Sequence, residues 1–217
     1  MLLPHAMTKA RPFEENATEY DAWFERHHDI YQAELAAVRA AVPVTGRGVE
    51  IGVGTGRFAG PLGISVGVEP SPRMAEIARR RGIEVLEGSA ESLPLADNSF
   101  DFAVMVTVVC FLDDVAKAFQ ETWRILKPGG TLVVGFIDRE SELGRTCSQK
   151  KSVFYRDARF YSVGELAEWL AKAGFSGFSY RQTLFPGETT HLDVREGFGT
   201  GSFVVIQAQK QERRQAH

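Results

Sequence analysis

The sequence predicts an α/β fold in which a mostly parallel sheet lies between two layers of helices. Short β-branched runs alternate with helical segments from Gly48 onward, the order expected of parallel strands joined by crossover helices. The run from Phe102 to Leu112 is apolar almost throughout, as expected for a strand that is covered on both faces. The last two β-like runs, Phe175 to Leu184 and Ser202 to Ala208, have no helical segment between them, so they should pair antiparallel at one edge.

Length and composition limit the class of protein. A chain of 217 residues suits one domain with a substantial core, so we expect a single domain over residues 1–217. Hydrophobic residues make up 44% and charged residues 24%, and the longest apolar run is shorter than the roughly 20 residues that span a bilayer. A net charge of -3 gives no electrostatic footprint for nucleic acid. We therefore expect neither a membrane nor a nucleic-acid partner.

The cysteines and the first residues bear on compartment and metal content. The two cysteines, Cys110 and Cys147, do not form a C-x-x-C pair, so we expect neither a disulfide framework nor a zinc site. Cys110 is expected to pack as a small apolar residue. No basic segment followed by an apolar one opens the chain, which favours a cytoplasmic protein.

The two ends of the chain differ from its centre. Residues 1–15 show no convincing period and are expected to be an extension, whereas residues 16–43 have a helical period and predict a helical cap that ends at Pro43. Tyr20 lies on an aromatic stripe of this cap, and such stripes usually pack in a core. Residues 209–217 are polar and are expected to form a flexible tail.

The chain is organised around Gly48 to Gly56, which reads G-V-E-I-G-V-G-T-G, and around Glu69 at the end of the next β-like run. Glycines after a strand let the backbone approach a ligand, and the two oxygens of an acid on the next strand can accept both hydroxyls of a ribose. The dinucleotide fingerprint G-x-G-x-x-G/A fails here, because Arg57 stands at the third small position.

The following elements continue the alternation. Ser71 and Pro72 predict the start of a helix, Glu84 to Leu86 predicts a third strand, and the turn G-S-A-E-S-L-P-L follows it. The apolar fourth strand should end beside the glycine loop, which places Thr107 in the crevice where open α/β sheets bind ligands.

The second half of the chain carries three further signals. Asp113 or Asp114 predicts the next helix cap, and R-I-L-K-P-G-G-T-L-V-V ends that helix and precedes a fifth strand over 132–137. The connection from Asp138 to Tyr161 is long and basic; a solvated loop is the favoured interpretation, although its place on the ligand side would suit acceptor recognition. Ser162 and Glu165 have the spacing of a capping box before the last helix.

In this order of motifs, the chain resembles the class I S-adenosylmethionine-dependent methyltransferases, in particular the small-molecule, methyltransferase type 11-like members. The motifs are E-x-G-x-G-x-G from Glu50, the acid Glu69, the G-S-A-E turn, the apolar fourth strand, the K-P-G-G turn and the terminal hairpin. The resemblance implies a Rossmann-like three-layer α/β/α sandwich. Its sheet would have seven strands in the order 3-2-1-4-5-7-6, with an antiparallel terminal hairpin and an N-terminal helical cap.

The resemblance also implies the cofactor S-adenosyl-L-methionine, the product S-adenosyl-L-homocysteine and a set of binding residues. Glu50 would order the turn and the amino-acid end of the cofactor, and Glu69 would bind the ribose. The adenine turn commonly reads G-D-A-E in the family, and Ser89 stands here in place of that aspartate. The candidate cofactor-binding residues are Glu50, Gly52, Gly54, Gly56, Glu69, Pro70, Ser89, Ala90, Glu91 and Thr107.

The implied reaction is a direct displacement, in which the acceptor attacks the methyl carbon in line with the departing sulfur. Such a reaction requires no catalytic triad, and a base, if one is used, would come from Tyr20, Asp138, Tyr155 or His191. An N-P-P-Y or D-P-P-Y motif is absent, which favours a small-molecule acceptor over a nucleic-acid base. Two alternatives stay open: a noncatalytic S-adenosylmethionine-binding regulatory module, and an NAD(P)-dependent oxidoreductase, against which Arg57 and the terminal hairpin argue.

Overall fold

The computed structural model describes residues 6–149, 152–188 and 193–211. Within these ranges, one sheet has eight strands. They are β1 (Gly48–Ile51), β2 (Val66–Glu69), β3 (Glu84–Glu87), β4 (Phe100–Val106), β5 (Leu126–Ile137), β6 (Phe175–Thr183), β7 (Arg195–Glu196) and β8 (Phe203–Lys210). The helices are α1 (Ala6–Glu15), α2 (Ala17–Arg26), α3 (His28–Arg39), α4 (Ala59–Leu62), α5 (Pro72–Arg80), the 3-10 turn η1 (Val109–Phe111), α6 (Val115–Ile125), α7 (Glu142–Gln149) and α8 (Val163–Ala173).

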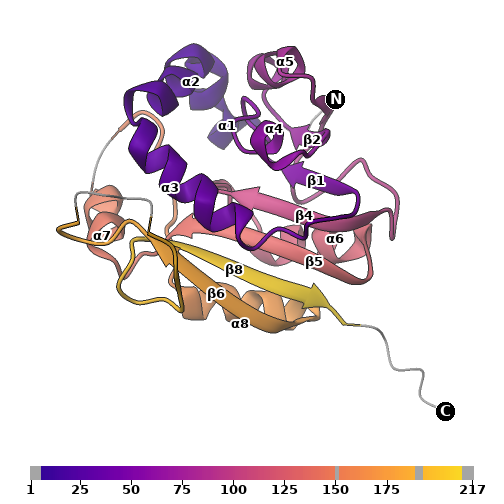
Figure 1. The fold of residues 1–217 in the computed structure, drawn as a ribbon. Helices are drawn as coiled ribbons and strands as arrows, with labels where there is room; N and C mark the ends of the chain where they lie inside the picture. Colours follow the sequence, from indigo (N-terminus) through magenta and orange to yellow (C-terminus); the bar gives the residue numbers. More distant parts are fainter. Residues whose placement is uncertain (1–5, 150–151, 189–192, 212–217) are drawn as a thin grey trace.

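The strand order confirms the predicted fold class. The sheet runs β3-β2-β1-β4-β5-β8-β6-β7 (Figure 1), which is the predicted order with one short strand, β7, added at the edge. The first five strands run parallel to one another, whereas β8 runs antiparallel to both β5 and β6. The last strands therefore form the predicted antiparallel hairpin.

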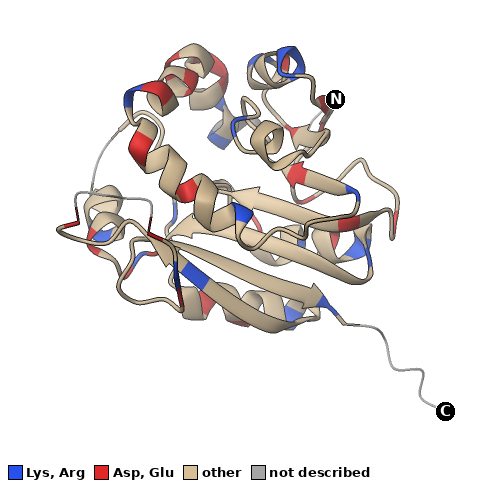
Figure 2. Cartoon of the chain, in the orientation of Figure 1, with Lys and Arg blue, Asp and Glu red and all other residues tan. Residues whose placement is uncertain are grey.

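Both faces of the sheet are buried, which makes three layers. Alternate strand residues such as Met105 and Leu132 join the core beneath α6 and α8. Their neighbours, such as Val104 and Val133, join the core beneath α3 and α5. In Figure 2 the central strands are tan over most of their length, and most charged residues lie on helices and connections. This two-sided burial explains why the fourth strand is apolar almost throughout.

Three predicted helix starts are confirmed by their caps. Ser71 Oγ accepts a hydrogen bond from the Met74 amide, and Pro72 is the first residue of α5. Asp114, of the two candidates, caps α6 by accepting from Lys117. Ser162 and Glu165 form the capping box of α8.

The structure corrects one N-terminal prediction and adds detail to another. Residues 1–15 contain a helix, α1, although Pro12 lies inside it and a proline normally disfavours a helix interior. Tertiary contacts of α1, described below, offset that cost. The helical cap expected over 16–43 consists of two helices, α2 and α3, which His27 separates with its non-helical dihedral angles (φ -120°, ψ 45°). The break lets α2 lie over the glycine loop while α3 crosses the sheet (Figure 1).

The second half of the chain needs three more corrections. β5 begins at Leu126, so the K-P-G-G turn lies inside the strand, where the register with β4 jumps from Phe100↔Leu126 to Phe102↔Thr131. The connection expected to be a charged loop contains α7. Residues 209 and 210, which were expected to belong to a flexible tail, are part of β8, and the Lys210 ammonium donates to the Leu126 carbonyl at 2.6 Å.

In the part of the chain that the structure describes, no helix is long and apolar enough to cross a membrane.

Candidate functional site

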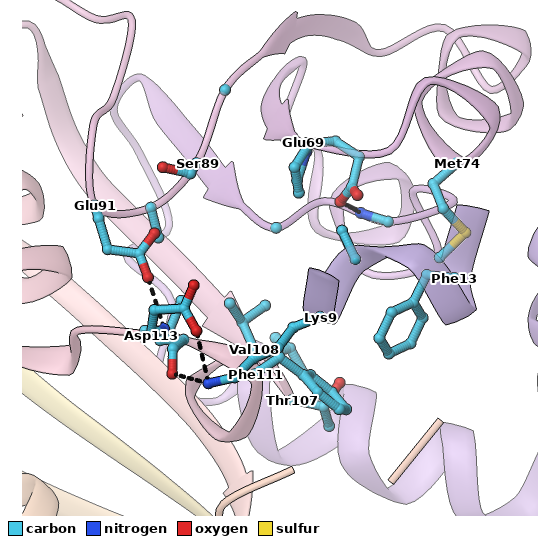
Figure 3. A pocket seen from close by; sticks show the side chains of 18 of the residues that line it. Lys9, Phe13, Glu69, Met74, Ser89, Glu91, Thr107, Val108, Phe111 and Asp113 are labelled. Carbon is cyan, nitrogen blue, oxygen red and sulfur yellow. Dashed lines mark hydrogen bonds and ion pairs between the residues drawn. The ribbon is translucent and has the colours of Figure 1, made fainter. Parts of the chain in front are cut away.

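A pocket opens at the carboxyl ends of β1, β2 and β4, where the predicted site residues meet (Figure 3). The chain reverses its winding direction at β1 and β4, and this is the place where open α/β sheets bind ligands. Eight of the ten predicted cofactor-binding residues line the pocket. They are Gly52, Gly54, Glu69, Pro70, Ser89, Ala90, Glu91 and Thr107.

Two glycines of the loop have different roles. Gly54 has a φ of +54°, and a Cβ there would point between Met74 and Tyr20, which both line the pocket. Gly56 has a φ of +82°, but a Cβ there would lie 2.5 Å from the Ile83 side chain and away from the pocket lining. Gly54 therefore leaves space for a ligand, whereas Gly56 lets the loop pack on the segment before β3.

Glu69 joins the end of β2 to the glycine loop. Its Oε2 accepts a hydrogen bond from the Gly54 amide at 2.9 Å, and its Oε1 accepts one from the Ser71 amide at 3.0 Å. The side chain is 6% exposed. Burial raises the pKa of Glu69 to about 7, although the two amide hydrogen bonds oppose the rise. Each carboxylate oxygen has lone pairs for more than one hydrogen bond, so both oxygens of Glu69 remain able to accept from ligand hydroxyls.

Glu50 lies behind the loop and not in the pocket lining. It is 2% exposed, accepts a hydrogen bond from the Ala59 backbone at the start of α4, and thereby holds the turn after β1. Burial raises the pKa of Glu50 well above its ordinary value, and the nearby charge of Glu69 adds to the rise. Within the described ranges, its Oε2 has no hydrogen-bond partner. The hydrogen bond to Ala59 is consistent with the predicted role of Glu50 in ordering the turn. Glu50 does not line the pocket, so the predicted contact with the amino-acid end of the cofactor stays a prediction.

The helix α1 lies across the pocket and is anchored at both of its ends. Lys9 Nζ donates to the Leu112 carbonyl at 2.8 Å and pairs with the Asp113 carboxylate at 2.9 Å (Figure 3). At the other end, Glu14 Oε2 accepts hydrogen bonds from the Ser71 hydroxyl at 2.6 Å and from the Arg73 amide. We call this helix with its two anchors the α1 strap.

The strap contributes pocket residues that the sequence prediction missed. Lys9, Ala10 and Phe13 all line the pocket. Their spacing places them on one face of a helix, which was the available signal, but the sequence prediction found no convincing period in residues 1–15. Glu91 was predicted to bind the cofactor, but its hydrogen bond to another pocket residue was not: its Oε1 accepts from the Asp113 amide at 2.9 Å.

Arg57 explains why the dinucleotide fingerprint fails. Its guanidinium donates to both carboxylate oxygens of Asp21 on α2, at 2.9 and 2.8 Å. Arg81 donates to the same carboxylate. Burial alone would raise the pKa of Asp21, but the hydrogen bonds from Arg57 and Arg81 outweigh it and hold the pKa below its ordinary value. Arg57 therefore fastens α2, which carries Tyr20, to the glycine loop.

Five aromatic side chains form what we call the aromatic wall: Phe13, Tyr20, Phe111, Phe154 and Tyr155. The ring of Phe13 lies 5.4 Å from Tyr20, 4.8 Å from Phe111 and 5.3 Å from Phe154, measured between ring centroids. Phe111 stacks on Tyr155 at 6.1 Å. The wall joins α1, α2, η1 and the segment after α7, so it closes one side of the pocket with residues that are distant in sequence.

A second, smaller cavity adjoins the pocket. Its lining includes Tyr155, Cys110 and Phe160, and Thr107 lines both cavities. Thr107 has a φ of +54°, an unusual value for a β-branched residue, and such strain often occurs at functional sites. Cys110 is buried as predicted, and burial raises the pKa of its thiol to about 12.

The four base candidates are not brought together. Tyr20 lines the pocket and Tyr155 lines the second cavity. Asp138 is buried just after β5, where it accepts from the Glu140 amide, and it lines neither cavity. His191 lies outside the described residues. Burial raises the pKa of both Tyr20 and Tyr155, so their hydroxyls stay protonated at neutral pH.

Among the residues that the structure describes, no group of three or more histidine, cysteine, aspartate or glutamate side chains is placed to hold a metal ion.

Known proteins resemble the chain over most of its length. Residues 49–134 match the model of a methyltransferase domain family. An uncharacterized protein of Methanocaldococcus jannaschii is 44% identical over 91% of this chain and 98% of its own length. A demethylmenaquinone methyltransferase of Roseiflexus is 38% identical over 73% of this chain and 79% of its own length. A crystal structure from Thermotoga maritima, described as a SAM-dependent methyltransferase and "possible histamine N-methyltransferase", superposes with a TM-score of 0.90 at 54% identity, covering 94% of this chain and 100% of that one.

Proposed function

The chain belongs to the family of S-adenosylmethionine-dependent methyltransferases, and we propose that it methylates a small-molecule acceptor by direct displacement. The observation that carries the proposal is the pocket at the carboxyl ends of β1, β2 and β4, in which Glu69 and Gly54 meet beneath a helix. The cofactor, S-adenosylmethionine, follows from membership of the family. The acceptor and the roles of individual residues are our inference.

The residues of the pocket fit the cofactor. Glu69 offers two carboxylate oxygens to the ribose hydroxyls, Gly54 leaves the space that a side chain would fill, and the turn at Ser89 to Glu91 lies where the adenine would bind. Met74 and Val108 supply apolar walls for a flat ring. When bound, S-adenosylmethionine supplies a methyl group that is already activated by the positive charge of its sulfonium.

The chain's own task is therefore to position the acceptor and to exclude water. Good positioning alone lowers a barrier by about 7 to 11 kcal/mol in well-oriented intramolecular reactions. The α1 strap covers the pocket and the aromatic wall closes its side, so the two together separate the reacting groups from solvent. Because neither tyrosine ionises near neutral pH, we assign Tyr20 and Tyr155 to shaping the site and to hydrogen bonding.

Two features support a small acceptor. The pocket is covered by α1, whose anchors at Asp113 and Ser71 would have to release to admit a polymer. In addition, the names of the Roseiflexus and Thermotoga relatives denote small-molecule acceptors: demethylmenaquinone for the first and, as "possible histamine N-methyltransferase", histamine for the second. These names describe the relatives, and they guide the choice of compounds for the test.

The test has two stages. Calorimetry of the purified chain should give saturable binding of S-adenosylhomocysteine and no binding of NADH; the reverse result would favour the oxidoreductase alternative. Turnover of methyl-labelled S-adenosylmethionine should then transfer label to a compound in a panel of small amines, phenols, thiols and quinones. Label transferred instead to protein or RNA would overturn the small-molecule proposal. Tight cofactor binding with no transfer to any acceptor class would favour the regulatory module.

A further inference from the structure

We propose that Asp21 on α2 is a positioning residue for the cofactor. Through its hydrogen bonds to two arginines it holds the Tyr20 ring over the space beside Gly54, and it thereby slows release of the cofactor product. This inference rests on the proposed function and deepens it, because it assigns control of cofactor retention to a side chain that does not line the pocket.

The helix α2 has two neighbouring faces that contact different parts of the molecule. Tyr20 and Phe24 are four residues apart, so they share one face, and their ring centroids lie 5.3 Å apart. Asp21 and Glu25 each follow by one residue, so they lie about 100° further round the helix. Both of these acids accept hydrogen bonds from Arg57. The helix therefore directs Tyr20 toward the pocket and Asp21 toward the glycine loop.

Asp21 joins α2 to two other segments. Its Oδ1 accepts from Arg57 Nε at 2.9 Å and its Oδ2 accepts from Arg57 Nη2 at 2.8 Å, which is a bidentate pair. The same Oδ2 accepts from Arg81 Nη2 at 2.9 Å, and Arg81 Nη1 donates to the Thr55 carbonyl at 2.7 Å. We call Asp21, Arg57 and Arg81 the Asp21 clasp. Because Thr55 directly follows Gly54, the clasp holds α2 against the glycine loop beside the pocket.

The Asp21 clasp is largely shielded from water. The side chains of Asp21, Arg57 and Arg81 are 19%, 16% and 29% exposed, whereas Glu25, the other acid that binds Arg57, is 66% exposed. Ion pairs that face solvent contribute little, but shielded bidentate pairs are stronger and fix the geometry of their partners. Asp21, rather than Glu25, therefore determines how α2 lies on the loop.

The ring of Tyr20 covers the space beside Gly54. Its Cε1 lies 3.9 Å from the position that a Cβ on Gly54 would occupy, and both residues line the pocket. The ring also lies 5.4 Å from Phe13 and 5.8 Å from Phe154, measured between centroids. A ligand in this space has the Gly54 backbone on one side and the Tyr20 ring on another. Displacement of Tyr20 would thus remove one wall of the cofactor site.

The position of Tyr20 can change without loss of the glycine loop. Without the Asp21 carboxylate, α2 would keep only the bond from Arg57 to exposed Glu25 and a longer bond, at 3.2 Å, from Arg57 to the Asp21 carbonyl. The loop would keep its own bond to α3, since the Tyr31 hydroxyl donates to the Arg57 carbonyl at 2.5 Å. A variant at Asp21 should therefore affect ligand release more than it affects the loop.

The experiment measures the dissociation rate of S-adenosylhomocysteine from the full chain by stopped-flow displacement, and its Kd by calorimetry. Asp21→Asn keeps the size of the side chain but loses its charge and one acceptor oxygen. It should raise the dissociation rate at least about fivefold. Glu25→Gln is the matched control, on the same helix and at the same arginine, and it should change the rate by less than about twofold.

A double substitution tests whether Asp21 acts through Tyr20. Tyr20→Ala should itself raise the dissociation rate, because it removes the ring. Asp21→Asn added to Tyr20→Ala should then change the rate by less than about twofold, since the ring that it positions is already absent. Thermal unfolding of each variant is recorded beside the rates. A side chain that only stabilises the fold would lower the melting temperature without changing release from the folded chain.

Three outcomes overturn the inference: Asp21→Asn releases the product at the wild-type rate, Glu25→Gln releases it as fast as Asp21→Asn does, or the effects of Asp21→Asn and Tyr20→Ala multiply in full. The third outcome would show that the clasp acts on the glycine loop directly. A wild-type chain that binds no S-adenosylhomocysteine refutes the proposed function, and this inference with it. If Asp21→Asn or Tyr20→Ala does not fold, Arg57→Lys or Tyr20→Leu replaces it, because lysine keeps the charge but cannot form the bidentate pair.

Discussion

The carboxylate of Glu69 accepts a hydrogen bond from the amide of Gly54, with 2.9 Å between Oε2 and N. This bond joins the ends of two neighbouring parallel strands, since Gly54 follows β1 and Glu69 ends β2. The glycine loop is therefore held in position by the acid that we propose binds the ribose. A ligand that meets such a preorganised site loses less affinity to ordering of the chain.

Replacement of Glu69 should weaken cofactor binding. Glu69→Ala removes the proposed acceptor of the ribose hydroxyls, and hydrogen bonds to a charged group contribute about 1.5 to 3 kcal/mol each. We expect the Kd for S-adenosylhomocysteine to rise at least about tenfold, measured by calorimetry. Glu87→Gln is the matched control, because Glu87 pairs in register with Glu69 on β3 but is exposed. Equal affinities for Glu69→Ala and wild type would refute the ribose assignment.

Alanine substitutions at Gly54 and Gly56 should affect cofactor binding and protein stability to different degrees. Gly54→Ala places its methyl group toward the pocket, near Met74 and Tyr20, and should weaken S-adenosylhomocysteine while lowering stability by about 1 to 2 kcal/mol for the positive φ. Gly56→Ala forces its methyl group against Ile83 and Ala78, which adds overpacking of about 1 to 3 kcal/mol to the same strain. Urea unfolding and calorimetry on both variants measure the two effects. A larger stability loss in Gly54→Ala than in Gly56→Ala would contradict the assignment.

Loosening the α1 strap should speed release of the cofactor product. Lys9→Met removes the anchor at Asp113, and Glu14→Gln weakens the anchor at Ser71. Each should raise the dissociation rate of S-adenosylhomocysteine several-fold in stopped-flow displacement, because α1 lies over the pocket. Arg11→Gln breaks an exposed ion pair with Glu15 on the same helix and should leave the rate unchanged. A rate that responds equally to all three substitutions would show that general helix stability, and not the anchors, controls release.

The ligand-free protein should lose stability as pH rises from about 5 to about 8. Burial raises the pKa of Glu34 to about 8 and of Glu69 to about 7, both from an ordinary value of 4.5. Between the unfolded and folded pKa values the folded state binds more protons, so the free energy of unfolding falls with rising pH. We expect a loss on the order of a few kcal/mol over this range from urea unfolding.

Glu34→Gln serves as the check on this pH dependence. It removes one of the buried carboxyls whose pKa is raised, and Glu50 and Glu69 remain, so its stability curve should be flatter than that of wild type and higher at pH 8. Tyr20 and Tyr155 contribute nothing in this window, since burial raises their pKa values further above it. A wild-type curve that rises between pH 5 and 8 would contradict the raised pKa values of Glu34 and Glu69.

Local sequence predicted most of the parts from which the site is built. The glycine loop, the acid at the end of β2 and the caps at Ser71 and Ser162 were all visible, because each depends on residues a few positions apart. The helix α1 was not visible, since Pro12 disfavours it and its anchors lie on Asp113 and Ser71, far along the chain. The aromatic wall was missed for the same reason.

The sequence by itself determined the order of the parallel strands and the terminal hairpin, the family and the position of the glycine loop, since periodicity and turn chemistry act over short range. Tertiary structure alone decided which polar groups lose their water. In the sequence, nothing distinguishes Glu34 from an exposed acid on an amphipathic helix. The structure shows that it is buried, because α3 packs on the sheet. In the sequence, Arg57 is only a departure from the dinucleotide fingerprint. The structure shows that its guanidinium donates hydrogen bonds to Asp21 of α2. Burial and pairing of charges arise between segments that only the fold brings together, and these determine how a side chain ionises and what it can bind.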